Sequence, residues 1–348
     1  MHTHALRAGL VTGLATLWLS TGTQAGQPTP PRALLALSKA DHTLSVVDLA
    51  TLSIVARYGV GPDPHEVATT TDARTAYVSN MVDGGGHEID VIDLAGQKVL
   101  PAIDTGPLRG THGLYVRDGK LWFTAQGAKA VAQLDVATGK VDWIIGTGQD
   151  GTHMVQVAPD GRRFYATNNG SGSVSLFEYR LVQPSSAVFG YVPPGREATL
   201  QWVQTVVPLA PGVEGIDVSP DGSELWTASP ASGQLFIIDT ASGKVTAQAA
   251  GLYGANRLRF TVDGKRLFVS SIRSGEVVVF DAATRAELKR LHFCGSSTGI
   301  AMDPDGKRAF VACSGEGYLA VIDLASLEVT GRLDVGGRPD GMAFAIRP

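Results

Sequence analysis

Seven similar phrases recur along this chain, and their spacing constrains the fold more than any other feature of the sequence. Each phrase runs from a turn into a short strand, and most close on an Asp-Gly corner, as in HMVQVAPDG, EGIDVSPDG and TGIAMDPDG. The phrases begin at His65, His112, His153, Glu214, Asn256, Thr298 and Asp340. Because intervals of about 40 to 50 residues are typical of propeller blades, the chain is expected to contain seven blade-like repeats.

The composition favours turn-rich β structure and excludes some partners. The sequence contains 42 Gly and 18 Pro, with only 18% charged residues. Its formal net charge of −4 argues against a nucleic-acid partner, because phosphate binding needs clustered Lys and Arg. No segment approaches 18 apolar residues in a row, so no membrane span is expected.

The first 25 residues have the pattern of a secretory signal peptide. A weakly basic start containing Arg7 precedes a mostly apolar stretch at residues 8–19, and small residues surround a cleavage site after Ala25. The pattern predicts a secreted or periplasmic protein with a cleaved signal peptide at residues 1–25. A short linker at residues 26–33 and a single domain at residues 34–348 then make up the mature chain.

The repeats read as β strands with a period of two. In the repeat that begins at Asn256, strands are expected at residues 256–261, 266–270, 276–280 and 286–291. The start of the domain offers three strands, at 34–38, 44–47 and 53–58, and its end offers one, at 340–346. Together they complete a blade. The sequence therefore predicts an all-β, seven-bladed propeller of four-stranded antiparallel blades, closed by sharing one blade between the termini.

The longest interval, between His153 and Glu214, indicates an insertion at about residues 179–203. It is expected to connect the third and fourth strands of its blade, on the face opposite the starts of the inner strands. A surface excursion is the simpler interpretation, and a contact with a protein partner is the alternative.

The second strands of the repeats share a four-residue tag. It reads YVSN at 77–80, YATN at 165–168, LWTA at 225–228 and FVSS at 268–271. The tag resembles the YVTN family of β-propellers, whose WD40-like repeats are also similar to those of lactonase-like and cytochrome d1-like propellers. The resemblance covers essentially the whole mature chain and implies the fold, but the same blade serves unrelated activities. The resemblance also leaves a d1-type haem open as a cofactor.

The first residues of the phrases are expected to meet at the mouth of the central channel. His65, His112 and His153 then face one funnel, with Glu214 and Asp340 beside them. Converging imidazoles next to a carboxylate suit a divalent transition metal such as zinc, copper or iron. A polar pocket for a small molecule without metal, and histidines that only structure the loops, are the alternatives. The asparagines Asn80, Asn168 and Asn256 are candidates for binding a ligand or cofactor.

Several functions fit this arrangement. A metal held by the histidines can support hydrolytic or oxidative chemistry on a small molecule, with Glu214 as general base and Arg257 steadying an anionic substrate. The similarity to lactonases implies a metal-free alternative in which His153, Glu214 and Arg257 act together. A non-catalytic scaffold that binds a ligand or a protein is the third possibility.

Cys294 and Cys313 are the only cysteines in the chain. Cys313 is expected opposite the start of the phrase at Thr298, and Cys294 lies just before that start. A disulfide is the favoured interpretation in an oxidising compartment. Thiolate ligation to copper is the alternative.

Overall fold

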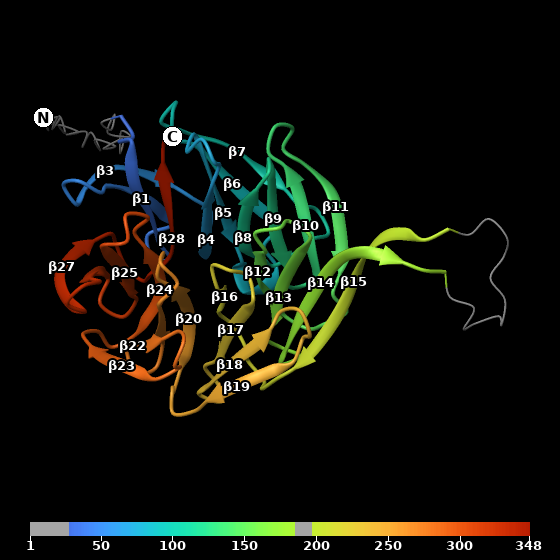
Figure 1. Ribbon diagram of the computed structural model, residues 1–348. Helices are drawn as coiled ribbons and strands as arrows, with labels where there is room; N and C mark the ends of the chain where they lie inside the picture. Colours follow the sequence, from blue (N-terminus) through green and yellow to red (C-terminus); the bar gives the residue numbers. More distant parts are fainter. Residues whose placement is uncertain (1–27, 185–196) are drawn as a thin grey trace, which may run out of the picture.

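The computed structural model describes residues 28–184 and 197–348, which form a ring of β sheets around a central axis (Figure 1). Within these residues the strands make seven four-stranded sheets, each one a blade. The fold predicted from the repeats is thus confirmed. In the described part of the chain no helix is long and apolar enough to cross a membrane. The signal peptide proposed for residues 1–25 lies outside the described residues.

Each blade contributes one strand to the wall of the central channel. In ring order these inner strands are β28 (Pro339–Ile346), β4 (Pro64–Thr69), β8 (Thr111–Arg117), β12 (Thr152–Val157), β16 (Ile216–Val218), β20 (Ala255–Phe260) and β24 (Ser297–Met302). The second strands are β1 (Arg32–Ser38), β5 (Thr75–Asn80), β9 (Lys120–Ala125), β13 (Arg163–Asn168), β17 (Glu224–Ser229), β21 (Arg266–Ser271) and β25 (Arg308–Cys313).

The remaining strands lead outward to the rim. The third strands are β2 (Thr43–Asp48), β6 (Glu88–Asp93), β10 (Ala130–Asp135), β14 (Ser173–Val182), β18 (Gln234–Asp239), β22 (Glu276–Asp281) and β26 (Tyr318–Asp323). The outer strands are β3 (Ser53–Gly59), β7 (Lys98–Asp104), β11 (Lys140–Gly146), β15 (Thr199–Pro208), β19 (Val245–Ala249), β23 (Glu287–His292) and β27 (Glu328–Asp334). One short 3-10 turn, Val82–Gly84, follows β5.

The two ends of the domain close the ring. β28 pairs antiparallel with β1, with Ala33 opposite Ala345 and Leu35 opposite Ala343, so this sheet has the order β28-β1-β2-β3. In Figure 1 the blue β1 lies beside the red β28. Main-chain hydrogen bonds between the termini replace two exposed sheet edges, as the sequence predicted.

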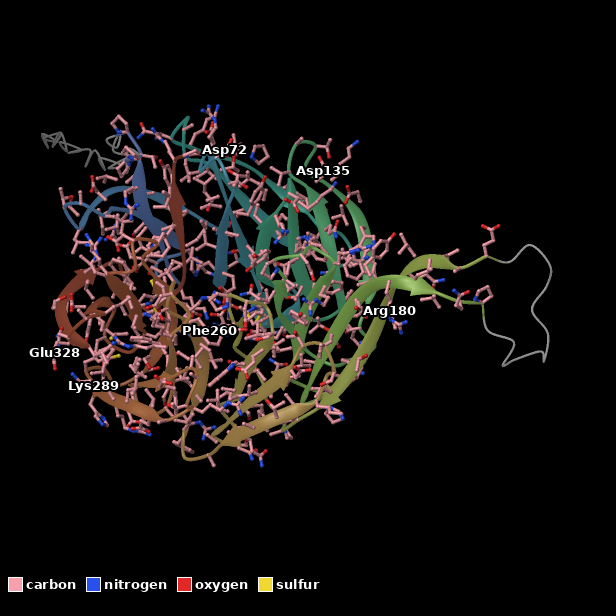
Figure 2. The ribbon with its side chains drawn as sticks, viewed as in Figure 1. Asp72, Asp135, Arg180, Phe260, Lys289 and Glu328 are labelled. Atoms are coloured by element: carbon pink, nitrogen blue, oxygen red, sulfur yellow. The ribbon has the colours of Figure 1, made fainter. Side chains whose placement is uncertain are left out.

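The core lies between the blades. The second and third strands are covered on both faces by neighbouring blades and are therefore buried almost throughout, as in β25 and β26. The outer strand β27 alternates between exposed and half-buried residues, because only one of its faces meets a neighbour. At this rim Lys289 of β23 and Glu328 of β27 form an ion pair between neighbouring blades (Figure 2).

The predicted insertion is partly an extension of its blade. β14 and β15 are ten residues long and pair from Ser173–Pro208 to Val182–Thr199, so the ends of the segment 179–203 are strand (Figure 1). The segment connects the third and fourth strands, as expected. Trp202, inside it, packs against Trp143 and Phe164 with ring centroids 5.9 and 4.8 Å away. These apolar contacts explain why the strands run on. A protein partner at this hairpin stays a prediction.

Candidate functional site

The structure places the first residues of the phrases at the channel, at or next to the starts of the inner strands. His65 lies in β4, His112 in β8 and His153 in β12, while Glu214 comes two residues before β16. Asp340 lies in β28. Since these inner strands are neighbours in the ring, their first residues share one polar site, which we call the axial site.

Glycines determine how closely the inner strands approach. The position after the first residue is glycine in four blades, namely Gly113, Gly215, Gly299 and Gly341. A Cβ atom on Gly215 would lie 2.2 Å from the carbonyl oxygen of Asn256, and one on Gly341 would lie 2.2 Å from that of His65. The other three blades have Glu66, Met154 and Arg257 at this position. Because the four glycines have no side chain, the space at the axis is available to the three large side chains of Glu66, Met154 and Arg257.

Hydroxyl groups of the four-residue tag hold the axial residues of the next blade. Ser79 Oγ donates a hydrogen bond to the carbonyl oxygen of His112 at 2.6 Å. Thr167 Oγ1 donates likewise to Glu214 at 2.8 Å. A buried carbonyl group must be paired, so these hydroxyls fix the main chain of the axial site. The tag therefore has a physical role that links blades.

The three histidines predicted to converge do so. The ring centroids of His65 and His112 are 4.7 Å apart, and those of His112 and His153 are 3.8 Å apart. Nε2 of His112 lies 2.9 Å from Nδ1 of His65. His153 Nδ1 contacts the side-chain amide of Gln126. The imidazoles thus form a nearly buried column.

Lys39, which the sequence analysis did not single out, provides a positive charge at this column. Its Nζ lies 2.7 Å from Asp340 Oδ2 and 3.2 Å from Nδ1 of His65. On its other side, His65 Nε2 contacts Asp63 Oδ1 at 3.0 Å. One consistent assignment has the Nε2–H group of His65 donating to Asp63 and its Nδ1 accepting from Lys39.

Arg257 connects two carboxylates. Its Nη2 donates to Glu66 Oε1 at 2.6 Å, and its Nη1 lies 3.9 Å from Glu214 Oε2. Glu214 Oε1 in turn lies 4.0 Å from Nε2 of His153. The sequence analysis did not predict a role for Glu66 either. The signal was present, because Glu66 occupies a position that is glycine in four of the seven blades. The catalytic pair predicted from sequence, Glu214 and Arg257, is therefore brought together with His153.

Burial and the charges of Lys39 and Arg257 together determine the pKa values of the groups in the axial site. Burial raises the pKa of Glu66 and of Glu214, and the nearby Arg257 opposes both shifts only partly. Burial, reinforced by neighbouring positive charge, lowers the pKa of His153 well below its ordinary value. Burial would also raise the pKa of Asp340, but Lys39 and Arg257 outweigh it and lower that pKa to about 2. The site therefore combines neutral imidazoles with carboxyl groups of quite different acidity.

The three asparagines predicted to bind a ligand lie in different surroundings. Asn80 donates to Asp90 at 2.9 Å, and Asn168 donates to Ser173 and Ser175 at 3.1 and 3.0 Å. These two amides stabilise their own blades. Asn256 lies in the axial site with a buried and unpaired Oδ1. Of the three, Asn256 has an amide oxygen without a hydrogen-bond partner, and its contact with a ligand stays a prediction.

Other buried polar atoms of the axial site also lack partners. They are Nδ1 of His112, Nη1 of Arg257 and Oδ1 of Asp340. Unpaired buried polar atoms cost free energy, and a cluster of them commonly marks the place of a water, ion or ligand. The axial site thus has unused hydrogen-bonding capacity.

The nitrogen donors do not form a compact ligand set as they stand. A compact metal site needs at least three His, Cys, Asp or Glu side chains with ligand atoms close together. Among the described residues, Cys294, Cys313 and Glu316 form such a group, with all three ligand atoms within 4.8 Å of one another. The ligand atoms of His65, His112 and His153 are not all within 4.8 Å of one another. The metal predicted for His65, His112 and His153 therefore stays a prediction.

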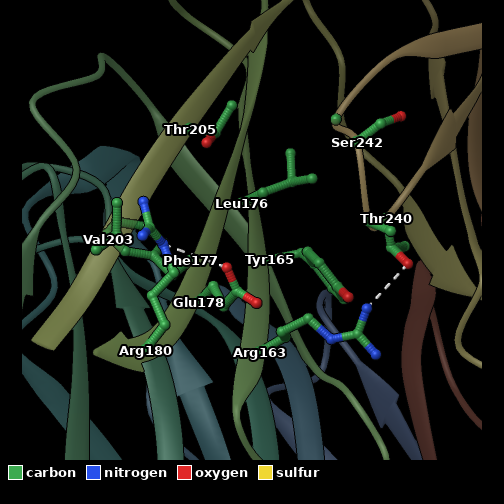
Figure 3. A pocket seen from close by; sticks show the side chains of 12 residues that line it. Arg163, Tyr165, Leu176, Phe177, Glu178, Arg180, Val203, Thr205, Thr240 and Ser242 are labelled. Atoms are coloured by element: carbon green, nitrogen blue, oxygen red, sulfur yellow. Dashed lines mark hydrogen bonds and ion pairs between the residues drawn. The ribbon is translucent and has the colours of Figure 1, made fainter. Parts of the chain in front are cut away.

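Two cavities differ in their relation to the axial site. A cavity of about 260 Å³ lies further along the inner strands and is lined by Glu66, Met154, Asp217 and Arg259, among others. A larger groove of about 470 Å³ lies between two blades, where Arg163 donates to Thr240 at 3.2 Å (Figure 3). The groove is formed by residues away from the axis, so it is not part of the axial site.

The two cysteines are free thiols in the structure, contrary to the disulfide favoured from the sequence. Cys313 lies opposite Ser297, at the start of β24, as expected. The Sγ atom of Cys294 instead lies 3.6 Å from the carbonyl oxygen of Gly275. The thiols are close to each other but unbonded.

The fold defines a seven-bladed β-propeller of four-stranded antiparallel blades with a polar site at its axis. A sequence model of the PQQ_2 family, described as outer membrane protein assembly factor BamB, matches residues 67–326. The chain therefore belongs to this family. None of the curated proteins matches the sequence significantly.

Solved structures with the same fold are distant in sequence. The periplasmic gluconolactonase PpgL of Pseudomonas aeruginosa is 19% identical with a TM-score of 0.68, covering 91% of this chain and 99% of its own. A putative 6-phosphogluconolactonase of Bacteroides uniformis is 13% identical with a TM-score of 0.71, covering 90% and 99%. The dihydro-heme d1 dehydrogenase NirN is 16% identical with a TM-score of 0.61, covering 96% and 78%.

Proposed function

We propose that this protein is a lactonase-like hydrolase that opens a small cyclic ester at the axial site without a metal. The observation that supports it most is the position of Glu214, between Nε2 of His153 at 4.0 Å and Nη1 of Arg257 at 3.9 Å. The three residues come from consecutive blades. The side chain of Glu214 is 26% exposed, against 6% and 11% for its two neighbours, so Glu214 is the member that a substrate can reach.

The chemistry needs a base and a group that stabilises negative charge. Glu214 takes a proton from a water molecule as the water attacks the lactone carbonyl, and the raised pKa of Glu214 makes it a better base at neutral pH. The unpaired Nη1–H group of Arg257 stabilises the oxygen on which negative charge develops. The ring C–O bond then breaks, and the leaving oxygen receives the proton from Glu214. His153 keeps the carboxylate in place.

The charges of the site favour an uncharged substrate. Three carboxyl groups, on Glu66, Glu214 and Asp340, surround two cationic side chains, those of Lys39 and Arg257. A phosphate on the substrate would meet this excess of carboxylates. The proposed substrate class is therefore the unphosphorylated lactone of a sugar acid, which agrees with the name of the P. aeruginosa relative.

The same relative and the signal-peptide pattern of residues 1–25 support a periplasmic location. A periplasmic lactonase would meet sugar lactones that form outside the cytoplasm. Localisation is tested by fractionating cells that express the full chain and determining the N-terminus of the exported protein. A new N-terminus at Gly26 in the periplasmic fraction is expected, and a full-length chain in the cytoplasm would contradict this part of the proposal.

Activity is tested by following acid release from gluconolactone at constant pH with the purified chain. Glu214→Gln is expected to lower kcat by about 100-fold or more, because it removes the base. Arg257→Lys is expected to lower it by a similar factor, because it removes the Nη1 donor. Glu224→Gln, which lies away from the axis on β17, is the matched control and should retain full activity.

Two results would overturn the lactonase proposal. One is a wild-type rate no faster than spontaneous lactone hydrolysis. The other is a Glu214→Gln variant as active as the wild type. Binding of the lactone without turnover would instead support the non-catalytic ligand-binding scaffold.

A metal-supported reaction is the second candidate, and one observation favours it. Nε2 of His112 and Nδ1 of His65 lie 2.9 Å apart, while Nδ1 of His112 is buried without a partner. A zinc, copper or iron ion would use such nitrogen donors. The ammonium group of Lys39, 3.2 Å from His65 Nδ1, opposes it by charge repulsion. This opposition is why the metal-free reaction ranks first.

Elemental analysis separates the two candidates. The purified chain is compared with a variant in which His65, His112 and His153 are all changed to Ala. Metal bound in stoichiometric amount and lost in a folded triple variant would favour the metal. Full lactonase activity in the presence of a strong chelator would rule the metal out.

A further inference from the structure

We propose that Cys294, Cys313 and Glu316 form a zinc-binding site at one end of the blade that consists of β24 to β27. The ligand atoms of these three residues all lie within 4.8 Å of one another. The site is separate from the axial site and takes no part in the proposed hydrolysis.

The backbone brings the two thiols to one end of the blade. Cys313 is the last residue of β25 and pairs with Ser297, the first residue of β24. Cys294 comes three residues before that strand, in the connection from β23. The thiol of Cys313 is fully buried, and that of Cys294 is partly exposed. A metal ion can therefore reach the pair from solvent.

A tight turn adds the carboxylate. The main-chain N–H groups of Glu316 and Gly317 both donate to the carbonyl oxygen of Cys313, at 3.2 and 3.0 Å. This turn puts the side chain of Glu316 next to the Cys313 thiol. The N–H group of Gly295 then donates to Oε1 of Glu316 at 2.7 Å. An exposed carboxylate is thus held beside two thiols by a hydrogen bond that leaves its other oxygen free to bind metal.

The donor set selects the metal. Zinc binds thiolates and carboxylates together and is four-coordinate, so two sulfurs and one oxygen leave one position for water. Copper(I) prefers soft sulfur donors alone, and calcium and magnesium take oxygen ligands. Each thiol loses its proton when the metal binds. The mixed set of Cys294, Cys313 and Glu316 therefore fits zinc best.

Cobalt(II) is the probe for this site. The full chain is reduced, freed of reductant and titrated with cobalt(II), and the thiolate-to-cobalt charge-transfer band in the near ultraviolet is recorded. One equivalent of cobalt should produce the band, and zinc should displace it. The band should persist in the variant that lacks His65, His112 and His153, because imidazole ligation gives no thiolate band.

Variants and a chemical measurement complete the test. Cys294→Ser should abolish the band, and Glu316→Gln should weaken cobalt binding by at least about tenfold. Glu328→Gln removes another exposed acid of the same blade and should change nothing. Zinc should also protect both thiols of the wild-type chain from alkylation, which requires no substitution of the buried Cys313.

Two outcomes would overturn the zinc site. The first is a reduced chain whose two thiols react freely and which gives no thiolate band with cobalt. The second is a chain isolated after export whose mass is lower by two hydrogens and whose thiols do not react before reduction. In the latter case the cysteines form a disulfide instead.

Discussion

The guanidinium group of Arg257 reaches across the ring to Glu66, with Nη2 of the first 2.6 Å from Oε1 of the second. Their strands, β20 and β4, belong to blades that are not neighbours. Both side chains are about nine-tenths buried. The pair therefore ties together opposite sides of the propeller at its axis, where no main-chain hydrogen bond can do so.

Removing one partner of this pair should destabilise the fold strongly. Glu66→Leu removes the short ion pair of Arg257 and leaves its buried charge with the longer contact to Glu214, at 3.9 Å, and with the more distant charge of Asp340. Breaking a buried ion pair typically costs about 3–5 kcal/mol. The free energy of unfolding, measured by urea denaturation, should fall by that amount.

Two controls test this prediction: a double variant that removes both partners, and a change that breaks a more exposed ion pair. Glu66→Leu combined with Arg257→Met should cost less than the sum of the two single changes, since neither member of this pair is left buried without the other. Arg285→Met breaks a more exposed pair with Glu224 and should cost less than about 1 kcal/mol. Strictly additive effects would mean that Glu66 and Arg257 do not stabilise each other.

Asp340 should make the fold sensitive to strong acid. The pKa of its carboxyl group is lowered to about 2 in the folded state, below about 3.9 in an unfolded chain. The ionised form therefore stabilises the fold above about pH 4, and this contribution is lost as the pH falls toward 2. About 2 kcal/mol of the free energy of unfolding is expected to disappear over that range.

The measurement compares wild type with Asp340→Asn by urea denaturation at a series of pH values. The variant should be less stable at pH 5, and the difference should shrink as the pH approaches 2. Asp118→Asn, at an exposed position, should follow the wild-type curve. A difference between wild type and Asp340→Asn that does not change with pH would contradict the prediction.

Gly215 should tolerate no side chain. An added Cβ atom would lie 2.2 Å from the carbonyl oxygen of Asn256 and 2.9 Å from the Cα atom of Arg257. Both are main-chain atoms, so the inner strands of two blades must separate. Gly215→Ala is expected to lower the free energy of unfolding by about 1–3 kcal/mol. Gly146→Ala, where a Cβ atom has no neighbour within 4 Å, should leave it nearly unchanged.

The sequence was sufficient to predict the blades, because each repeat consists of short apolar or alternating segments separated by turns rich in Gly, Asp and Pro. For the repeat that begins at Asn256, the strands β20 to β23 lie within about one residue of the predicted bounds at all their starts and ends. The closure by β28 and β1 followed from counting strands at each end. Such features depend on neighbouring residues, and so they can be read without knowing the fold.

The axial site was only partly predictable. The histidines were found because they occupy equivalent positions in successive repeats. Lys39 has no such equivalent, since it lies in the turn after β1 and reaches His65 only because the ring closes between the termini. Glu66 meets Arg257 through side chains that cross the channel, and no periodic pattern encodes a contact across the axis. Contacts of this kind require coordinates.

The hydroxyl of Thr124 provides the last prediction, which concerns the link between blades. Its Oγ1 donates to the carbonyl oxygen of His153 at 2.6 Å and accepts from the N–H group of Gly113 at 2.8 Å. Thr124→Val keeps the shape but leaves both buried main-chain groups unpaired, so the free energy of unfolding should fall by about 1–3 kcal/mol. Thr124→Ser keeps the hydroxyl and should recover most of that loss. Equal stability of the Val and Ser variants, measured by urea denaturation, would show that packing of the methyl group, and not the hydrogen bond, joins β9 to β12.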